Sequence, residues 1–322
     1  MTTAKNEGPY FLEWIAYHRL IGFQNFIVFQ NDSDDFTHEI LACLASLGII
    51  TYKYNRAGVG RQQVNAYRRA AKQPDYLEAD WVMALDMDEF LCLHAPLQTL
   101  DQWFGKLPEA DQVFVNWAMF GNSGHTALTD DLVTSRFHLA SVRESGAGKL
   151  RSFKTLFRRE AFQRPGIHMP RGLPEEAGAR PAIRSINGSG LSEPEFERKN
   201  YRSTDPQICR YAQINHYIVR DAESFVLKAW KGSAHQANRS VDQNYWIRRN
   251  RNRSSDTSLV LWAGKIQAEM NALDKASGGE LMRLRALSID AHRAKFQQII
   301  KEDEYRDLYN YCCLNNGIRS II

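Results

Sequence analysis

The segment ADWVMALDMDEFL, residues 79–91, decides the fold. Its first half is an apolar run typical of a buried β-strand, and its second half carries three carboxylates: Asp86, Asp88 and Glu89. Side chains two residues apart on a strand point to the same face, so Asp86 and Asp88 can converge on one ligand. That much negative charge at the end of a buried strand predicts a cationic partner there.

Helix-like and strand-like patterns alternate before this segment. The expected helices are residues 9–22, 39–48 and 61–73, and the expected strands are residues 24–32 and 49–55. This alternation predicts an α/β protein with a Rossmann-like, mostly parallel sheet flanked by helices. Ligands of such sheets bind at the carboxyl ends of the strands, so the polar segment 31–33 and the acidic segment 86–89 should open onto one crevice.

The pattern is looser after residue 95. We expect strands at 113–121 and 211–219 and a helix over 223–232, whereas residues 163–207 are rich in Pro, Gly and Arg and indicate little regular structure. Residues 258–300 carry helical patterns, which predicts a C-terminal helical extension.

Bulk composition fits an ordinary globular protein. The 322 residues are 43% hydrophobic and 24% charged, with a formal net charge of +4. The five cysteines are odd in number and form no CxxC, which argues against a disulfide framework or thiolate zinc site and favours a reducing cytosol. No apolar run is long enough for a membrane span, and residues 1–8 do not resemble a signal peptide. We therefore expect a cytoplasmic location, and a location at the inner face of the membrane stays open.

A local basic cluster, RRNRNR, occupies residues 248–253. One basic run is usually a solvated face, and no nucleic-acid-binding motif accompanies it, so we expect no nucleic-acid partner. Such a run can instead attract anionic acceptors or a membrane surface, which leaves peripheral membrane association open.

The Asp86-x-Asp88 pair suits a hard divalent cation, Mn²⁺ or Mg²⁺, because such ions prefer oxygen ligands. A cation there can bridge the phosphates of a nucleotide and stabilise a departing diphosphate. The plain alternative is a solvated turn whose acids cap the next helix, and an isolated D-x-D triplet does not decide between them.

Further segments, in order, carry a family resemblance. They are AKNEGPYFLEWIAYHRLIGFQNFIVFQNDSDD (4–35), the opening segment, NWAMFGNSG (116–124), and INHYIVR (214–220) with KAWKG (228–232). Together they resemble the glycosyltransferase family 2-like group, closest to the branch related to family 92, over roughly residues 4–260. The resemblance implies a GT-A fold over residues 1–257, with a nucleotide-binding half (1–95), an acceptor half (96–257) and a helical extension (258–322).

The resemblance also implies an activity. The expected reaction moves a sugar from a nucleoside diphosphate sugar, by family habit a UDP-sugar, to a hydroxyl on a glycan, lipid-linked or protein-glycan acceptor. It implies a divalent metal and inversion at the anomeric carbon, which needs a general base. The resemblance assigns these residues to the nucleotide sugar: Lys5, Glu7, Asn31, Asp32, Arg61 and Asp86.

Metal ligands carried over from the resemblance are Asp86, Asp88 and His216, with Glu89 as a supporting group behind them. A hydrogen-bonded strand histidine is an equally good interpretation of His216. For the acceptor side we expect Trp117 and His168, although core packing is the common fate of such aromatic residues.

The general base has two candidates, Asp256 in RSSDTS and Asp242 in SVDQNY, and either could instead cap a helix. Lys228 and Lys231 could contact diphosphate, but a solvated helix face is the more common role. Glu13 and His18 we interpret as structural network residues on the first helix.

One departure from the family pattern concerns the first strand, because only residues 1–4 precede KNE. We expect a short first strand, and we expect residues added upstream to raise the melting temperature. A clipped strand and an unclear base keep a second hypothesis open: a non-catalytic sugar- or nucleotide-binding relative with the same fold.

Overall fold

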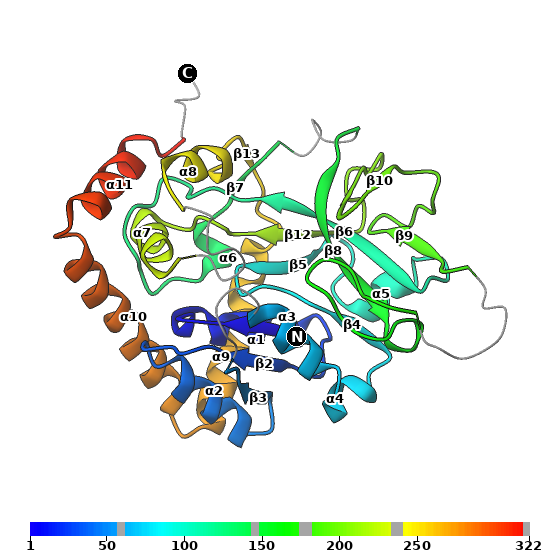
Figure 1. The fold of residues 1–322 in the computed structure, drawn as a ribbon, viewed down its shortest axis with the longest axis horizontal. Helices are drawn as coiled ribbons and strands as arrows, with labels where there is room; N and C mark the ends of the chain where they lie inside the picture. The colour runs from blue at the N-terminus through cyan, green and yellow to red at the C-terminus, as the bar shows by residue number, and fades with distance from the viewer. Residues whose placement is uncertain (57–61, 143–147, 174–181, 233–240, 318–322) are drawn as a thin grey trace.

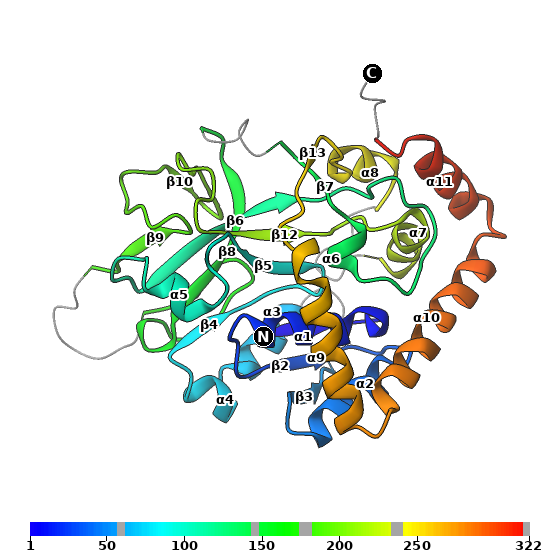
Figure 2. The same ribbon diagram turned by 180° about the vertical axis from the view of Figure 1, so that it is seen from behind.

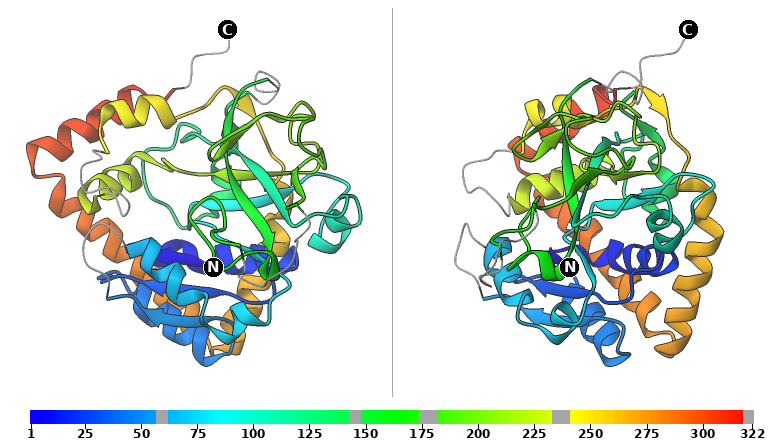
Figure 3. Two further views of the ribbon diagram at one scale, coloured as in Figure 1. Left: turned by 45° about the vertical axis from the view of Figure 1, so that its right-hand side comes forward. Right: turned by 90° about the vertical axis from the view of Figure 1, so that its right-hand side faces the viewer.

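The computed structural model describes residues 1–56, 62–142, 148–173, 182–232 and 241–317 (Figure 1). Its strands form a three-stranded sheet near the N-terminus and a larger sheet from the middle of the chain. In Figure 3 the N-terminal elements, in blue, form a layer against the larger sheet, in cyan to yellow. The α/β class predicted from the sequence is confirmed.

The N-terminal layer alternates strands and helices, as the sequence predicts. Its elements are β1 (Thr2–Ala4), α1 (Gly8–Leu20), β2 (Ile27–Gln30), α2 (Thr37–Ser46), β3 (Thr51–Tyr54), α3 (Gln62–Ala70) and α4 (Pro74–Leu77). The sheet order is β1-β2-β3 and both pairings are parallel. Pro9 lies in the first turn of α1, where its missing N–H costs no hydrogen bond, and Gly22 follows the helix with φ of 110°, a conformation that favours glycine.

The two sheets are joined beside β1. The Met1 amino group donates to the Met83 carbonyl at 2.9 Å, and the Leu85 N–H donates to the Met1 carbonyl at 3.1 Å. The chain that leaves β4 (Trp81–Met83) therefore runs along β1. This contact brings Asp86 to the edge where β1 and β2 end, which is the arrangement that the sequence predicts.

The larger sheet has the order β10-β11-β8-β6-β12-β5, with β4 added at β8 and β9 at β6. Its strands are β5 (Glu89–Leu93), β6 (Gln112–Met119), β8 (Arg151–Arg158), β9 (Ser185–Asn187), β10 (Arg198–Lys199), β11 (Arg202–Ser203) and β12 (Ala212–His216). Only the pairings of β6 with β12 and with β9 are parallel. The prediction of a mostly parallel sheet therefore holds for the N-terminal layer but is wrong for the larger sheet.

A short connection explains part of this difference. Only residues 84–88 separate β4 from β5, whereas a parallel pair needs a crossover of about a dozen residues or more. β5 instead pairs antiparallel with β12, and Glu89 lies opposite His216 in the register. Asp86 and Asp88 thus lie in a turn between two strands rather than before a helix, and Glu89 is the first residue of β5.

Several smaller elements lie beside the larger sheet. They are α5 (Leu100–Phe104), α6 (Val133–Arg136), β7 (Leu139–Ala140), α7 (Ala222–Lys231), α8 (Gln243–Arg249) and β13 (Ser254–Ser255). Within the described part of residues 163–207 the regular elements are the short strands β9, β10 and β11, which agrees with the irregular composition of that segment.

Three C-terminal helices follow, as predicted: α9 (Ala263–Ala276), α10 (Glu280–Ile299) and α11 (Asp303–Leu314). Ile266 and Met270 of α9 and Leu281 and Leu284 of α10 belong to the same hydrophobic core as α1, and Figure 2 shows α9 crossing in front of α1. Helix α11 packs through Leu308 on the core formed with α7 and α8. None of the helices described is both long and apolar enough to span a bilayer.

Two buried polar residues tie α1 to its surroundings, which confirms their interpretation as network residues. Glu13 accepts hydrogen bonds from the Val133 and Thr134 N–H groups at 2.8 and 2.9 Å, at the start of α6. His18 lies 2.8 Å from the Trp14 carbonyl through Nδ1, and its Nε2 accepts from the Leu91 N–H at 3.4 Å. Burial lowers the pKa of His18 to about 3, so its ring is neutral at pH 7.

A pH dependence of stability follows from His18. Its pKa is lower in the folded state than its ordinary value of 6.5, so acid favours the unfolded chain, and the stabilisation is complete above pH 6.5 and lost as the pH falls towards 3. Between pH 7 and pH 4.5 this one group should lower the free energy of unfolding by about 2–3 kcal/mol. Urea titrations at the two pH values should show a correspondingly smaller loss in His18→Gln. An equal loss in both proteins would contradict the prediction.

Candidate functional site

A cleft of about 640 Å³ opens where β1 and β2 end beside the turn at residues 86–89, which we call the acidic turn. Its lining brings together residues from the N-terminal layer, the larger sheet and α7. Eight residues predicted from the sequence line it: Lys5, Glu7, Asn31, Asp86, Asp88, Trp117, His168 and His216. The expected convergence of Asn31 with the acidic turn is confirmed.

Asp86 is held through both carboxylate oxygens. Gln63 Nε2 donates to Oδ1 at 2.7 Å, and Lys154 Nζ donates to Oδ2 at 3.0 Å. The side chain nevertheless remains 29% exposed towards the cleft. Because both of its oxygens are already held, Asp86 is better suited to accept hydrogen bonds from a ligand than to bind a metal ion directly.

Asp88 faces the cleft between a lysine and a histidine. Its Oδ2 accepts from Lys228 Nζ at 3.1 Å, and its Oδ1 lies 3.4 Å from His216 Nε2. Burial by itself would raise the pKa of Asp88, but the Lys228 ammonium and His216 hold that pKa well below its usual value. Asp88 is therefore ionised throughout the neutral range and ready to bind a cation.

Glu89 and Lys154 form a buried pair beneath the acidic turn. Neither side chain has exposed surface, and Lys154 Nζ lies 3.2 Å from Glu89 Oε2. Burial raises the pKa of Glu89 to about 8, although Lys154 opposes this shift. Burial would lower the pKa of Lys154, but Asp86 and Glu89 raise it, so the lysine stays charged. Glu89 Oε2 also accepts the Asp86 N–H at 2.9 Å, which shapes the turn.

His216 stands between Asp88 and Glu89. Its Nδ1 lies 3.9 Å from Glu89 Oε1, and within the described chain neither atom has a hydrogen-bond partner. Burial lowers the pKa of His216, although Asp88 opposes this shift, so the ring is neutral at pH 7. The Trp117 ring meets the imidazole edge-on, with centroids 4.4 Å apart, and fixes the plane of the ring.

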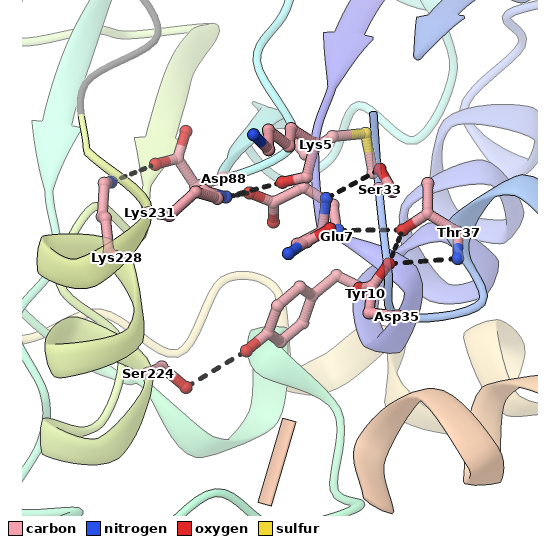
Figure 4. Close-up of polar contacts among 12 residues, drawn as sticks. Lys5, Glu7, Tyr10, Ser33, Asp35, Thr37, Asp88, Ser224, Lys228 and Lys231 are labelled. Carbon is pink, nitrogen blue, oxygen red and sulfur yellow. Dashed lines mark hydrogen bonds and ion pairs between the residues drawn. The ribbon is translucent and has the colours of Figure 1, made fainter. Parts of the chain in front are cut away.

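The loop after β1 is held by two cations, as Figure 4 shows for Lys231. Glu7 accepts from Lys231 Nζ at 2.8 Å and from Arg220 Nη1 at 3.1 Å. Lys231 also donates to the Lys5 carbonyl at 2.7 Å. Burial opposes ionisation, but Lys231 and Arg220 still lower the pKa of Glu7 below its usual value. Lys231 therefore has a defined site contact, as does Lys228, and neither is simply a solvated surface residue.

Arg220 joins this loop to the acidic turn. Its Nη2 donates to the Met87 carbonyl at 3.3 Å, and its guanidinium lies 3.4 Å from the centroid of the Tyr10 ring. Arg220 itself has a φ of 53°, a conformation that non-glycine residues adopt at some cost. Arg220 therefore links Met87, the residue between Asp86 and Asp88, to Tyr10 of α1.

The remaining nucleotide-side residues differ in position. Asn31 lines the cleft and accepts from Asn55 Nδ2 at 2.6 Å. Asp32 instead lines a neighbouring surface groove, where the Tyr54 hydroxyl donates to it. Asp32 is expected beside Asn31 in the cleft but does not line it, because the chain turns away after Asn31. Arg61 lies outside the described residues.

Neither predicted general base presents its carboxylate to the cleft. Asp242 caps α8, since its Oδ1 accepts the Tyr245 N–H at 2.9 Å, although Val241 and Tyr245 on either side line the cleft. Asp256 accepts from Gln213 Nε2 at 2.8 Å and from the Ser258 N–H at 3.1 Å, and does not line the cleft. Both acids make the capping or turn contacts that the sequence left open, and their role as the base stays a prediction.

The residues present fit a divalent cation held by two side chains. Two ligands of one octahedral Mg²⁺-like ion lie about 3 Å apart, close to the 3.4 Å between Asp88 Oδ1 and His216 Nε2. Glu89 Oε1 lies 3.9 Å from His216 Nδ1, so the other ring nitrogen, Nε2, is the one that faces Asp88 and a bound cation. No group of three His, Cys, Asp or Glu in the described residues surrounds one point, so phosphate oxygens and water would complete the shell.

Sequence reasoning missed Lys154 and Arg220. A signal for Lys154 does exist: it is the single charge inside the apolar stretch FKTLF, and a buried lysine needs an acidic partner. Which acid it meets depends on the pairing of β8 with β4 and β6, and that pairing is not visible in the sequence. Arg220 gives no comparable local signal.

Known proteins share sequence with this chain. Residues 4–246 match the family described as glycosyltransferase family 92. A family 92 protein of Oryza sativa subsp. japonica is 29% identical over 140 residues, which cover 42% of this chain and 23% of that protein. One of Arabidopsis thaliana is 28% identical over 85 residues, covering 26% and 14% respectively.

The match thus spans less than a quarter of either plant protein. Among solved structures, HddC from Yersinia pseudotuberculosis is similar with a TM-score of 0.30 and 10% identity, over 57% of this chain and 82% of that one. The family match extends from the loop before Glu7 to α8 and includes the acidic turn and His216. The chain belongs to glycosyltransferase family 92.

Proposed function

We propose that this chain is a metal-dependent glycosyltransferase that uses a nucleoside diphosphate sugar as donor. The observation that carries the proposal is the convergence of an ionised Asp88, a neutral His216 and the ammonium groups of Lys228 and Lys231 along one cleft. Carboxylate and imidazole suit a divalent cation, and the lysines suit the phosphates that would share it. Family membership supports the same chemistry.

Donor binding is assigned to the N-terminal side of the cleft. Lys5, Asn31 and Asp86 line this side, at the edge where parallel strands end and nucleotides commonly bind. Asp86, with both oxygens anchored but still partly exposed, is suited to accept hydrogen bonds from ribose hydroxyls. We propose a UDP-sugar, on the basis of the family resemblance alone.

We assign charge neutralisation to Asp88, His216 and Lys228 at the centre of the cleft. Mn²⁺ or Mg²⁺, held by Asp88 and His216, would neutralise charge on the departing diphosphate. Lys228 donates to Asp88 and to the Ile218 carbonyl and can turn its third N–H group to a phosphate oxygen. Lys231 and Arg220 keep Glu7 ionised and in place, so that this carboxylate does not compete for the cation.

The acceptor side is an aromatic wall. The rings of His168 and Tyr201 are stacked with centroids 4.9 Å apart, and Trp117 lies 5.4 Å from His168. All three line the cleft, and flat apolar faces beside polar groups are suited to sugar rings. A glycan, lipid-linked or protein-glycan acceptor fits this wall. We propose inversion, with Asp242 as the candidate base: its neighbours Val241 and Tyr245 line the cleft, and its carboxylate would have to leave the Tyr245 N–H to reach an acceptor hydroxyl.

A second candidate is a binding protein of the same fold that lacks turnover. The specific observation in its favour is that the carboxylates lining the cleft, Glu7, Asp86 and Asp88, all have cationic partners. Such a protein would bind nucleotide sugars but would not release nucleoside diphosphate.

Donor hydrolysis tests the proposal. A panel of UDP-, GDP-, CMP- and dTDP-linked sugars is incubated with the protein and Mn²⁺, and the released nucleotide is quantified. The proposal expects release from one nucleotide class that stops when the metal is chelated. Saturable donor binding without any release, with acceptor mixtures included, would favour the binding protein instead.

A further inference from the structure

A second cavity lies behind the cleft, between α1, α7 and α10, and we call it the rear pocket. Its volume is about 70 Å³, several times the roughly 10–15 Å³ that one water needs. The residues that line it and not the cleft include Tyr10, Arg220, Ser224, Trp230, His292 and Lys295. Helix α10 closes one side of this pocket. That helix lies beyond the family match, which ends at residue 246.

Two ion pairs form the wall between the rear pocket and the cleft. Lys228 with Asp88 and Lys231 with Glu7 border both cavities (Figure 4). The figure also shows the Tyr10 hydroxyl, which lies 3.1 Å from Ser224 Oγ across the rear pocket side of this wall. A ligand in the rear pocket would therefore lie next to the groups that we assign to donor binding.

The acids that line the rear pocket are already satisfied. Asp35 accepts from the Gly8 N–H at 3.1 Å and from Thr37, and lies 2.7 Å from His292 Nε2. Asp34 accepts from Asn6 Nδ2 at 2.6 Å. With Glu7 and Asp88 paired to lysines, these carboxylates leave little capacity for a cation.

Donor capacity, in contrast, is left over. Arg220 is 9% exposed, and its Nε, which has no hydrogen-bond partner among the described residues, has almost no exposed surface, so the guanidinium can attract an anion by its charge but not through this N–H. Lys295 Nζ lies 4.7 Å from the centroid of the Trp230 ring and 3.3 Å from Gln298 Oε1, and no carboxylate of the described chain pairs with it.

We propose that the rear pocket is a binding site for a small oxyanion of the phosphate or carboxylate class. Lys295 and the Tyr10 and Ser224 hydroxyl pair supply its donors, Arg220 adds positive charge, and Trp230 and Leu227 supply an apolar wall. The proposal does not depend on the transferase assignment, because it rests on the pocket and its unused donors.

Binding there has a route to the cleft. Arg220 holds both Glu7 and the Met87 carbonyl, so an anion that draws the guanidinium towards the rear pocket would loosen both contacts. Donor affinity should therefore change when the rear pocket is filled, and by reciprocity the donor should change anion affinity by the same factor.

Titration calorimetry tests the site directly. The full chain is titrated with sodium phosphate and, separately, sodium acetate, in metal-free buffer with sodium chloride adjusted to constant ionic strength. We expect saturable binding of at least one anion, and the two arms identify the class. Ala291→Leu should fill the pocket and weaken this binding at least fivefold.

Two further variants of α10 make the result specific. Lys295→Met removes a cation that borders only the rear pocket, and should weaken binding at least fivefold even if Ala291→Leu fails to fold. Ala294→Leu, on the exposed face of the same helix, should bind like the unmodified protein. Equal affinity in Lys295→Met and the unmodified protein would overturn the proposal and place the anion in the cleft, and so would the absence of saturable binding by either anion.

Discussion

Asp88→Asn should abolish metal-dependent donor hydrolysis while the protein stays folded. The substitution keeps the shape of the side chain but removes the charge that faces His216 Nε2 at 3.4 Å. Charge stabilisation at the diphosphate is worth several kcal/mol, so turnover should fall by about 100-fold or more. Binding of Mn²⁺, followed by calorimetry with the nucleoside diphosphate present, should be lost as well.

Stability separates this effect from misfolding. Lys228 loses its carboxylate but still donates to the Ile218 carbonyl at 2.8 Å, so the free energy of unfolding should fall by no more than about 1–2 kcal/mol. Asp290→Asn, which removes an exposed acid on α10, should leave hydrolysis unchanged. Full hydrolysis by Asp88→Asn would show that the metal assignment is wrong.

Lys154→Met should be among the most destabilising single substitutions in this chain. The lysine has no exposed surface and holds Asp86 and Glu89 at 3.0 and 3.2 Å. Without it, two acids face one another below the cleft with no cation, and breaking a buried pair in this way costs about 3–5 kcal/mol. Urea denaturation at neutral pH measures the loss.

A double substitution tests the reason for the loss. Glu89→Gln removes one of the two acids, so in combination with Lys154→Met the free energies should not add, and part of the stability should return, by about 1 kcal/mol or more. Lys149→Met, an exposed lysine just before β8, should change stability by less than about 0.5 kcal/mol. A loss below 1 kcal/mol in Lys154→Met would mean that the acids do not need this lysine.

Local sequence patterns were sufficient for the N-terminal layer. Apolar runs closed by Asn31 and Asp86 predicted where two strands end, and the hydrogen bonds of Met1 with Met83 and Leu85 bring these two ends together. His216 could be connected to the acids only through the family resemblance. Its position opposite Glu89 comes from the register of β12 against β5, which no local pattern reports.

The sequence did not specify the cationic partners of the acids. Lys154 lies in β8, Arg220 in the loop between β12 and α7, and Lys228 in α7, and each meets its acid only through tertiary packing. The general base meets the same limit: Asp242 and Asp256 have the neighbours expected of a cap or of a base, and their hydrogen bonds to the Tyr245 and Ser258 N–H groups do not test the role of base.

The most direct test of the transferase assignment is a thermal-shift panel. Nucleoside diphosphates and their sugars are each added with Mn²⁺ and with a chelator, and the unfolding midpoint is recorded, because a ligand of the folded state raises that midpoint by mass action. The account predicts a rise with one nucleotide class, uridine by our proposal, that requires Mn²⁺ and is absent in Asp88→Asn. No rise with any nucleotide, in the presence or absence of metal, would contradict it.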